Sequence, residues 1–338
     1  MKKFVKKNLY VLFITAMMSL IIISCDQSSR ESSDVKEAAT GNANEIMVVM
    51  SNANWKGEMG EAIRSVYHQD LYTVPQQEMI FDLYQIEKRD FKKLNRRNRN
   101  VLIPEIGKGA EYGEIKKAKN VYSKPQLIVY IKAPDMPSFI ETVQENEDML
   151  IEVFLKADRD RILDYLRDYH VEAYRERLEK DHHVSMAVPK NYNFDENRDN
   201  FAWLAYETQK ASHGYLVYRF GKSERDSASL DYFVRKRNEE LKENVPGPRE
   251  GSYMTTETKY HYPVLSRRMI NNEETWIMEG LWKVEGDFMG GPFAAFIQYD
   301  DVRDEFVCIE AFTYDPRGDN RDQIRKMKAA LWTMKVVE

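Results

Sequence analysis

The residue best placed to do chemistry is a cysteine near the start of the chain. Cys25 follows Ile22, Ile23 and Ser24, the order in which a lipobox presents a thiol for acylation. The thiol is the nucleophile that receives a diacylglyceryl group, and the small serine lets a peptidase close on the bond before it. Each buried methylene contributes about 0.8 kcal/mol, so two or three acyl chains on Cys25 would hold the protein to a membrane.

The residues before this cysteine have the pattern of a secretion signal. A short apolar run, Leu9 to Ile23, follows four basic residues, Lys2, Lys3, Lys6 and Lys7, which is typical of a signal peptide. The run is shorter than the roughly 20 residues that a membrane-spanning helix needs. We therefore predict a lipoprotein signal peptide at 1–24 and a lipid-anchored protein of the cell envelope. The outer membrane is the expected location, and the periplasmic or surface face stays open.

The segment after the cysteine is polar, and the chain as a whole is acidic. Residues 26–44 hold one bulky apolar residue, Val35, so 25–44 is predicted to be a flexible tether. The chain has 50 Lys and Arg against 55 Asp and Glu, a net charge of −5; removing residues 1–24 deletes four lysines and no acids, which gives −9. This acidic balance argues against nucleic acid as a partner.

Beyond Cys25 the sequence offers no reactive constellation. Cys308 lies in the apolar stretch EFVCIEAF, which predicts a buried, inert thiol. His182 and His183 follow a charged helix without the ligand spacing of a zinc site, so a pair exposed to solvent is expected. Neither Gly-x-Ser-x-Gly nor His-Glu-x-x-His occurs. We predict no catalytic residue, no metal and no cofactor.

A glycine-rich stretch of the second half is the candidate for ligand binding. In GDFMGGPF, residues 286–293, two glycines and a proline lie between expected strands. A structural hairpin or bulge explains them. The other interpretation is the edge of a groove for a ligand, or for an envelope protein or glycan partner, with aromatic stacking surfaces. Its candidate residues are Trp282, Phe288, Gly290, Gly291 and Phe293.

A basic segment is the second candidate surface. Between Lys88 and Arg99 there are seven positive side chains and one acid, Asp90. A solvated helix face is the simpler interpretation. The alternative is contact with a polyanion, either lipid head groups or cell-surface sugars, through Lys92, Lys93, Arg96 and Arg97.

The elements that must position these residues alternate between strands and helices. In the first half, apolar runs predict strands at 45–50, 79–91 and 126–134, and helical periodicity extends over 136–180. In the second half, helices are expected at 228–243 and 320–334, with Asp319 or Asn320 as the cap of the last helix. The strands expected there are 183–194, 201–208, 214–220, 274–286, 290–301 and 304–315.

This order predicts an α+β protein of two domains, 45–183 and 184–338, each a mostly antiparallel sheet with packed helices. In the strand over 274–286, the side chains of Trp276, Met278, Trp282 and Val284 are expected on one face. The element order of the second domain distantly resembles the PsbP and Mog1 proteins.

The chain as a whole resembles a known family. The lipobox, the Ser-rich tether, VVMSNANWKGEMGEAIR, RRNRNVLI and EGLWKVEGDFMGGPF together are similar to Bacteroidota lipoproteins grouped as domain of unknown function DUF4837, over about 45–338. The resemblance implies an envelope location and no catalytic residue. We therefore expect a non-catalytic binding or interaction module; the alternative is an envelope hydrolase whose carboxylate pair is assembled by the fold.

Overall fold

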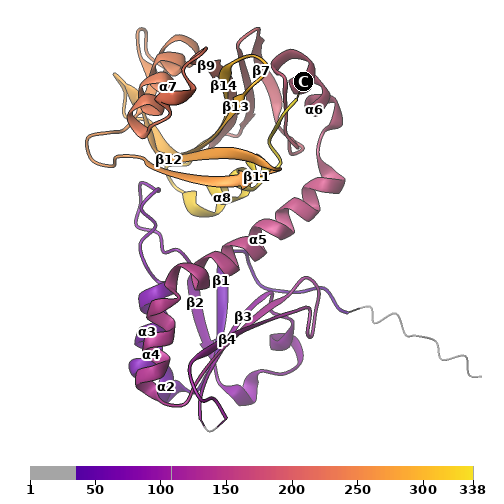
Figure 1. Cartoon of the computed structure of the whole chain (residues 1–338), viewed down its shortest axis with the longest axis vertical. Helices are drawn as coiled ribbons and strands as arrows, with labels where there is room; N and C mark the ends of the chain where they lie inside the picture. Colours follow the sequence, from indigo (N-terminus) through magenta and orange to yellow (C-terminus); the bar gives the residue numbers. More distant parts are fainter. Residues whose placement is uncertain (1–35, 108, 338) are drawn as a thin grey trace, which may run out of the picture.

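The computed structural model describes residues 36–107 and 109–337. Cys25, the predicted signal peptide and most of the predicted tether lie outside these residues, so the structure does not address these predictions. Two domains are stacked along the long axis of the molecule and joined by helix α5, Glu147–Tyr169 (Figure 1). Within the described ranges, no helix is long and apolar enough to cross a membrane.

The first domain is built on a five-stranded sheet in the order β2-β1-β3-β5-β4. Its strands are β1 (Glu45–Val49), β2 (Asp82–Ile86), β3 (Asn100–Ile106), β4 (Glu114–Lys119) and β5 (Leu127–Ala133). Three of the four pairings are parallel, and only β4 pairs antiparallel, with β5. The prediction of a mostly antiparallel sheet is therefore wrong for this domain. Parallel strands are covered on both faces, which explains the continuous apolar runs of β1, β3 and β5.

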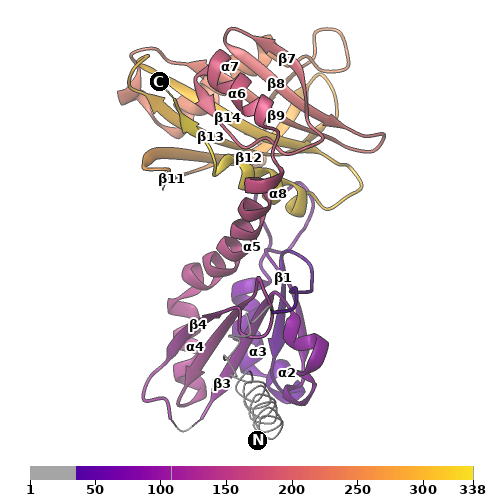
Figure 2. The same cartoon turned by 90° about the vertical axis from the view of Figure 1, so that its right-hand side faces the viewer.

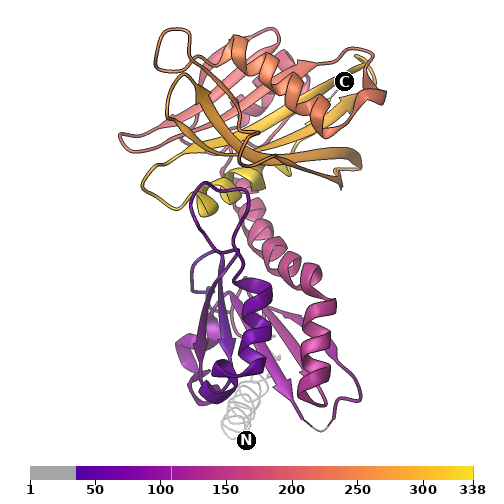
Figure 3. The ribbon, with the colours of Figure 1, turned by 90° about the vertical axis from the view of Figure 1, so that its left-hand side faces the viewer.

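Helices cover one face of this sheet. The helices α2 (Asn52–Lys56), α3 (Glu58–Tyr67) and α4 (Met136–Glu145) lie beside the first half of α5 (Figures 1 and 3). Gly60 permits the contact between α2 and α3, because a Cβ there would lie 1.9 Å from the carbonyl oxygen of Trp55. The opposite face packs against the side chain of Phe91, so the basic segment 88–99 covers the other side of the sheet.

Helix α5 belongs to the cores of both domains. Leu150 and Phe154 are buried in the core of the first domain, whereas Leu166 is buried in that of the second. Figure 2 shows the helix running from one domain into the other without interruption. A continuous helix with each end buried in a different core fixes the direction in which the second domain leaves the first.

The second domain contains an eight-stranded antiparallel sheet in the order β10-β12-β13-β14-β9-β8-β7, with β11 also paired to β12. The strands are β7 (Asn193–Arg198), β8 (Phe201–Glu207), β9 (Ser212–Phe220), β10 (Tyr253–Thr256), β11 (Val264–Ile270), β12 (Glu273–Glu285), β13 (Gly290–Asp300) and β14 (Glu305–Tyr314). Two short strands, β6 (Val184–Ser185) and β15 (Lys335–Val336), pair separately. The predicted α+β class is confirmed, and this sheet is antiparallel as expected.

Each face of the second sheet buries its own core. Helix α7 (Leu230–Asn244) covers one face, and α6 (Glu172–His182) and α8 (Asn320–Leu331) cover the other. The period of two expected along β12 is confirmed, because all four predicted residues of one face lie in the core under α7: Trp276, Met278, Trp282 and Val284. Ile277 points into the opposite core. The predicted boundary between residues 183 and 184 falls at the end of α6.

Polar contacts join the domains at the start of α8. Asp319 stands at the N-cap position, but its side chain makes no capping bond. The carboxylate of Glu78 in the first domain instead accepts from the N–H groups of Asn320 at 2.9 Å and Arg321 at 3.0 Å. Arg321 also donates to Asp82 at 2.8 Å. A carboxylate is favourable at a helix N-terminus, where the first N–H groups lack partners within the helix, so α8 is capped by the neighbouring domain.

Candidate functional site

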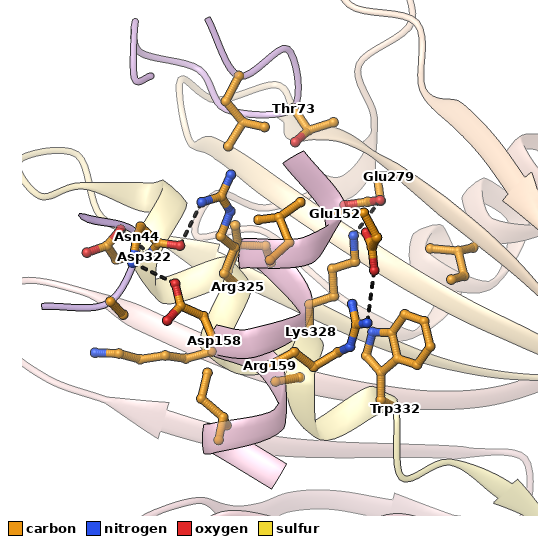
Figure 4. Close-up of a pocket in the computed structure, with 18 of the residues that line it drawn as sticks. Asn44, Thr73, Glu152, Asp158, Arg159, Glu279, Asp322, Arg325, Lys328 and Trp332 are labelled. Atoms are coloured by element: carbon orange, nitrogen blue, oxygen red, sulfur yellow. Dashed lines mark hydrogen bonds and ion pairs between the residues drawn. The ribbon is translucent and has the colours of Figure 1, made fainter. Parts of the chain in front are cut away.

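The candidate site is a pocket of about 310 Å³ between the two domains. One wall is formed by α5 and the segments around Asn44 and Thr73 of the first domain, and the other by β11, β12 and α8 of the second (Figure 4). The capping of α8 by Glu78 fixes the second wall relative to the first. Because both domains supply side chains, the pocket exists only while they stay docked.

The pocket has an apolar surface and charged groups around it. Its apolar lining comes from the facing helices and from β12, namely Leu155, Ile162, Ile277, Ile324, Ala329 and Trp332. The guanidinium of Arg159 lies 3.9 Å from the centre of the Trp332 ring, a geometry in which a cation and an aromatic face attract each other. A ligand with an apolar portion can therefore replace water along this wall.

Each of the four carboxylates that line the pocket is already bonded. Arg159 donates to Glu152 at 3.0 Å, and Lys328 donates to Glu279 at 2.6 Å (Figure 4).

Asn44 joins the other two carboxylates. Its backbone N–H donates to Asp158 at 2.9 Å, and its side-chain amide donates to Asp322 at 2.8 Å. Asp158 is also paired with Arg161, and Asp322 with Arg321. The negative groups of the pocket are thus held in place by neighbours on the protein.

Arg325 differs from these paired groups. It donates to the side-chain oxygen of Asn44 at 2.6 Å and to the carbonyl oxygen of Ile80 at 2.7 Å, both neutral acceptors. Burial, and secondarily the charge of Arg321, lowers the pKa of Arg325 to about 10, so the guanidinium stays charged at neutral pH. In the described part of the chain it forms no salt bridge within 4.0 Å.

Two further cations border the same pocket. Arg268 on β11 and Lys326 on α8 are exposed, and among residues 36–107 and 109–337 neither forms a salt bridge with a carboxylate. With the acids occupied and three cations available, the arrangement is suited to hold an anion by charge-assisted hydrogen bonds.

The structure does not bring the predicted aromatic residues together as one surface. Trp282 is 2% exposed and Phe293 1% exposed, and both lie in the core under α7, whereas Phe288 is 97% exposed. The stacking surface expected from them is wrong, because β12 and β13 turn Trp282 and Phe293 inward.

The two glycines of this stretch are structural. A Cβ at Gly291 would lie 2.0 Å from the carbonyl oxygen of Thr313, and one at Gly290 would lie 2.7 Å from that of Trp282. Gly291 is buried and Gly290 half-buried. The strands meet too closely here for larger residues, which is the hairpin interpretation.

The basic segment forms two short 3₁₀ helices, η1 (Lys88–Asp90) and η2 (Lys93–Arg97), instead of a longer helix face. Lys92, Lys93 and Arg96 are exposed. Arg97 is half-buried and donates twice to the carbonyl oxygen of Ala38, at 2.9 and 3.1 Å. Three of the four predicted contact residues are thus accessible, while Arg97 is bonded within the fold.

Two other expectations have different outcomes. Cys308 is buried, as predicted, and burial raises the pKa of its thiol. The expectation of a solvent-exposed histidine pair is wrong for His182, which is 1% exposed and bonded to Asn197 at 2.7 Å. Burial also lowers the pKa of His182, which favours the neutral ring.

Sequence reasoning missed the pocket residues because no short motif contains them. Asn44 lies 114 residues before Asp158 and 281 before Arg325. The one local signal is the spacing of Arg321, Arg325 and Lys328 along the last helix, which places three cations on one face.

Comparison with known proteins gives families rather than activities. Residues 172–333 match the family described as domain of unknown function DUF4837, and residues 39–167 match a second one, domain of unknown function DUF8532. The DUF4837 match is thus narrower than the expected 45–338. The comparison with curated proteins found no match.

Three solved structures align weakly, each at a TM-score that assigns no fold. The Ran-binding protein Mog1p of Saccharomyces cerevisiae is 10% identical, with 46% of this chain and 91% of that chain covered and a TM-score of 0.28. LpqN, involved in cell envelope biogenesis of Mycobacterium tuberculosis, is 11% identical, with coverages of 46% and 83% and a TM-score of 0.26. Human STARD10 is 10% identical, with coverages of 47% and 74% and a TM-score of 0.23. The family resemblance is thus supported for residues 172–333, which match the model of the DUF4837 family.

Proposed function

We propose that the chain is a lipid-anchored protein of the cell envelope, located at the outer membrane, that binds a small amphiphilic anion between its two domains. The anchor is supported by the sequence, in which Cys25 follows a basic flank, an apolar core and a small residue. The binding role is supported by the interdomain pocket.

The observation that carries the binding role is the charge of Arg325. Arg325 is half-buried and, within the described residues, has no carboxylate within 4.0 Å, so its guanidinium loses part of its solvation without gaining a direct ion pair. The two neutral acceptors, Asn44 and the carbonyl of Ile80, satisfy hydrogen bonds. The carboxylates of Asp322, Asp158 and Glu279 stabilise the charge only from beyond ion-pair distance. A phosphate or carboxylate in the pocket would supply a direct ionic partner for Arg325.

Size and lining define the rest of the ligand. Small-molecule pockets typically span about 300–1,000 Å³, so this one suits a compact molecule. Its apolar wall, which includes Leu155, Ile277 and Trp332, would pack against a short hydrocarbon or ring. The ligand class is therefore an anionic head with a short apolar tail.

The geometry favours binding over the alternative of a hydrolase that uses a carboxylate pair. Such a mechanism needs one carboxyl group as an acid and a second that is free to act as a base or nucleophile. In the pocket, Glu152 and Glu279 each accept from a cation, and Asp158 and Asp322 are both bonded to Asn44. Turnover of ester or glycan substrates that disappears when one of these acids is replaced would favour the hydrolase instead.

Titration calorimetry with matched probes tests the binding role. Octyl phosphate carries the proposed head and tail, whereas octyl glucoside has the same tail and no charge. We expect octyl phosphate to bind at least tenfold more tightly. Arg325→Gln should weaken its binding by roughly 10- to 100-fold, since hydrogen bonds to charged groups contribute about 1.5–3 kcal/mol, and Arg325→Lys should retain part of the affinity.

The matched control is Arg317→Gln, which removes an exposed arginine of the same domain that does not line the pocket. The affinity of this variant for octyl phosphate should stay within twofold of that of the wild type. Equal binding of both probes, or an Arg325→Gln variant that binds like this control, would contradict the proposal.

Mass spectrometry of protein isolated from cells tests the anchor independently. The expected species begins at Cys25 and carries the mass of a diacylglyceryl group, and Cys25→Ser should move the protein out of the membrane fraction. A chain that retains residues 1–24, or an unmodified thiol at its first residue, would refute the anchor while leaving the pocket untouched.

A further inference from the structure

The described chain begins on the basic side of the first domain. The N–H of Thr40 donates to the carbonyl oxygen of Arg97 at 2.8 Å, and that of Arg99 returns a bond of 2.8 Å to Thr40. The N–H of Ala39 likewise donates to the carbonyl oxygen of Lys124 at 3.1 Å. The first described residues are therefore held between the segment 88–99 and the turn 119–126.

These three segments form one continuous surface, which we call the basic face (residues 36–40, 88–99 and 119–126). The side-chain amide of Gln126 donates to the carbonyl oxygens of Arg96 at 2.6 Å and Asn98 at 2.7 Å. The ring of Tyr122 lies between Phe91, at a centroid distance of 5.7 Å, and the guanidinium of Arg96, at 5.0 Å. The cations are thus presented by a bonded framework.

The charge of this face stands out in an acidic chain. Five of its basic residues are exposed and form no salt bridge within the described ranges, namely Lys92, Lys93, Arg96, Lys119 and Lys124. Only two acids belong to the face, Glu37 and Asp90. The face therefore carries a local excess of positive charge that is opposite to the net charge of the protein.

Apolar side chains are exposed among these cations. Leu94 is 61% exposed, Tyr122 38% and Val121 36%. Cations interspersed with exposed leucine and tyrosine suit the boundary of a bilayer, where the charges meet lipid phosphates and the apolar groups reach the acyl region.

We infer that the basic face docks on a bilayer with anionic head groups. The inference rests on the membrane address of the proposed function, because Lys36 lies eleven positions after Cys25, and a chain reaches at most about 3.6 Å per residue. An acylated Cys25 would therefore keep the basic face within about 40 Å of the lipid. None of its residues lines the interdomain pocket, so docking leaves that pocket accessible.

Vesicle sedimentation with residues 36–338, which contain both cores and lack the acylation site, tests the inference without the anchor. Vesicles of phosphatidylcholine with about 30% phosphatidylglycerol are compared with pure phosphatidylcholine. We expect binding to the anionic vesicles alone, and a steep loss of binding as salt is raised. Replacing Lys92, Lys93 and Arg96 together by Gln should weaken binding about 100-fold, at roughly fivefold per cation.

The matched control replaces Lys210, Lys222 and Lys335 by Gln, because these exposed lysines lie in the second domain and form no salt bridge within the described ranges. It removes the same charge and should bind within twofold of the wild type. Circular dichroism and thermal unfolding verify that both triple variants are folded. Equal weakening in the two triple variants, or wild-type binding to neutral vesicles as strong as to anionic ones, would overturn the inference.

Leu94→Ser separates a bilayer from other polyanions. It should weaken vesicle binding about tenfold and leave the binding of heparin, a soluble polyanionic sugar, unchanged, because only a bilayer offers an apolar phase to this side chain. Heparin binding without vesicle binding would overturn the lipid assignment. Failure of the anchor would appear instead as an unmodified Cys25 in mass spectrometry, with vesicle binding by the basic face intact.

Discussion

Arg237 and Glu310 form an ion pair in the core of the second domain, and breaking it should be costly. Arg237 is 1% exposed and Glu310 0% exposed. The guanidinium of Arg237, on α7, donates to the two carboxylate oxygens of Glu310, on β14, at 2.6 and 2.7 Å. It also donates to Thr256 at 2.7 Å and lies 3.8 Å from the centre of the Phe293 ring. The pair joins the helix to the sheet that it covers.

Arg237→Met leaves the carboxylate of Glu310 buried with the hydroxyl of Tyr218, at 3.1 Å, as its remaining donor. Removing one member of a buried pair costs about 3–5 kcal/mol, and we expect a loss of this size. In Arg237→Met/Glu310→Met no buried charge remains at this position. Since apolar replacements of whole buried pairs are often neutral or stabilising, the double variant should recover at least about 2 kcal/mol of that loss.

Urea unfolding followed by tryptophan fluorescence measures this effect in the correct domain. Four of the five tryptophans, at positions 203, 276, 282 and 332, lie in the second domain, and only Trp55 lies in the first. Trp55→Phe in all variants makes the signal specific. A loss below about 1 kcal/mol for Arg237→Met, or a double variant as unstable as the single one, would refute the idea that an unpaired buried charge is the main cost.

Three further predictions concern stability and domain docking. Burial, aided by the charges of Glu243 and Glu239, raises the pKa of Glu240 from 4.5 to about 7. The stability that Glu240 contributes is therefore complete below pH 4.5 and is lost as the pH rises through 7. After discounting for its exposure, we expect Glu240→Gln to be about 1 kcal/mol more stable than the wild type at pH 8 and unchanged at pH 4; an equal gain at both pH values in urea unfolding would contradict this. Glu78→Ala removes the cap of α8 and should lower the free energy of unfolding by about 1–2 kcal/mol. It should also widen the distribution of domain orientations measured by small-angle scattering. An unchanged scattering profile would mean that Arg321 and Arg325 suffice to hold the domains together. Gly291→Ala should lower the melting temperature strongly, because its Cβ would lie 2.0 Å from a carbonyl oxygen. The control, Gly107→Ala, places its Cβ with no atom within 4 Å and should leave the melting temperature nearly unchanged. Equal melting temperatures of the two variants would show that β13 can shift.

Local patterns predicted much of the fold because they report burial directly. The four residues of β12 predicted on one face share one core, since alternation in a strand follows from its geometry. The helices predicted at 228–243 and 320–334 begin within two residues of α7 and α8. The direction of strand pairing in the first domain did not follow from any local pattern, because it depends on connections such as the one between β1 and β2, which passes through α2 and α3.

The candidate site was hidden from sequence for a different reason. Trp282 and Phe293 have the residue types of a binding surface, yet aromatic residues serve cores as readily, and burial decided between the two. Arg325 has no local feature that separates it from Arg321 or Lys328. Its neighbours, Asn44 and Ile80, are set by the docking of two domains. Only the folded chain shows that no carboxylate of the described residues lies within 4.0 Å of its guanidinium.

A crystal structure of the protein with octyl phosphate tests the central claim most directly. We predict the phosphate within hydrogen-bonding distance of the Arg325 guanidinium and the octyl chain along Ile277, Ile324 and Trp332, with the carboxylate pairs of the pocket unchanged. A phosphate bound elsewhere, with Arg325 still bonded only to Asn44 and Ile80, would contradict the claim.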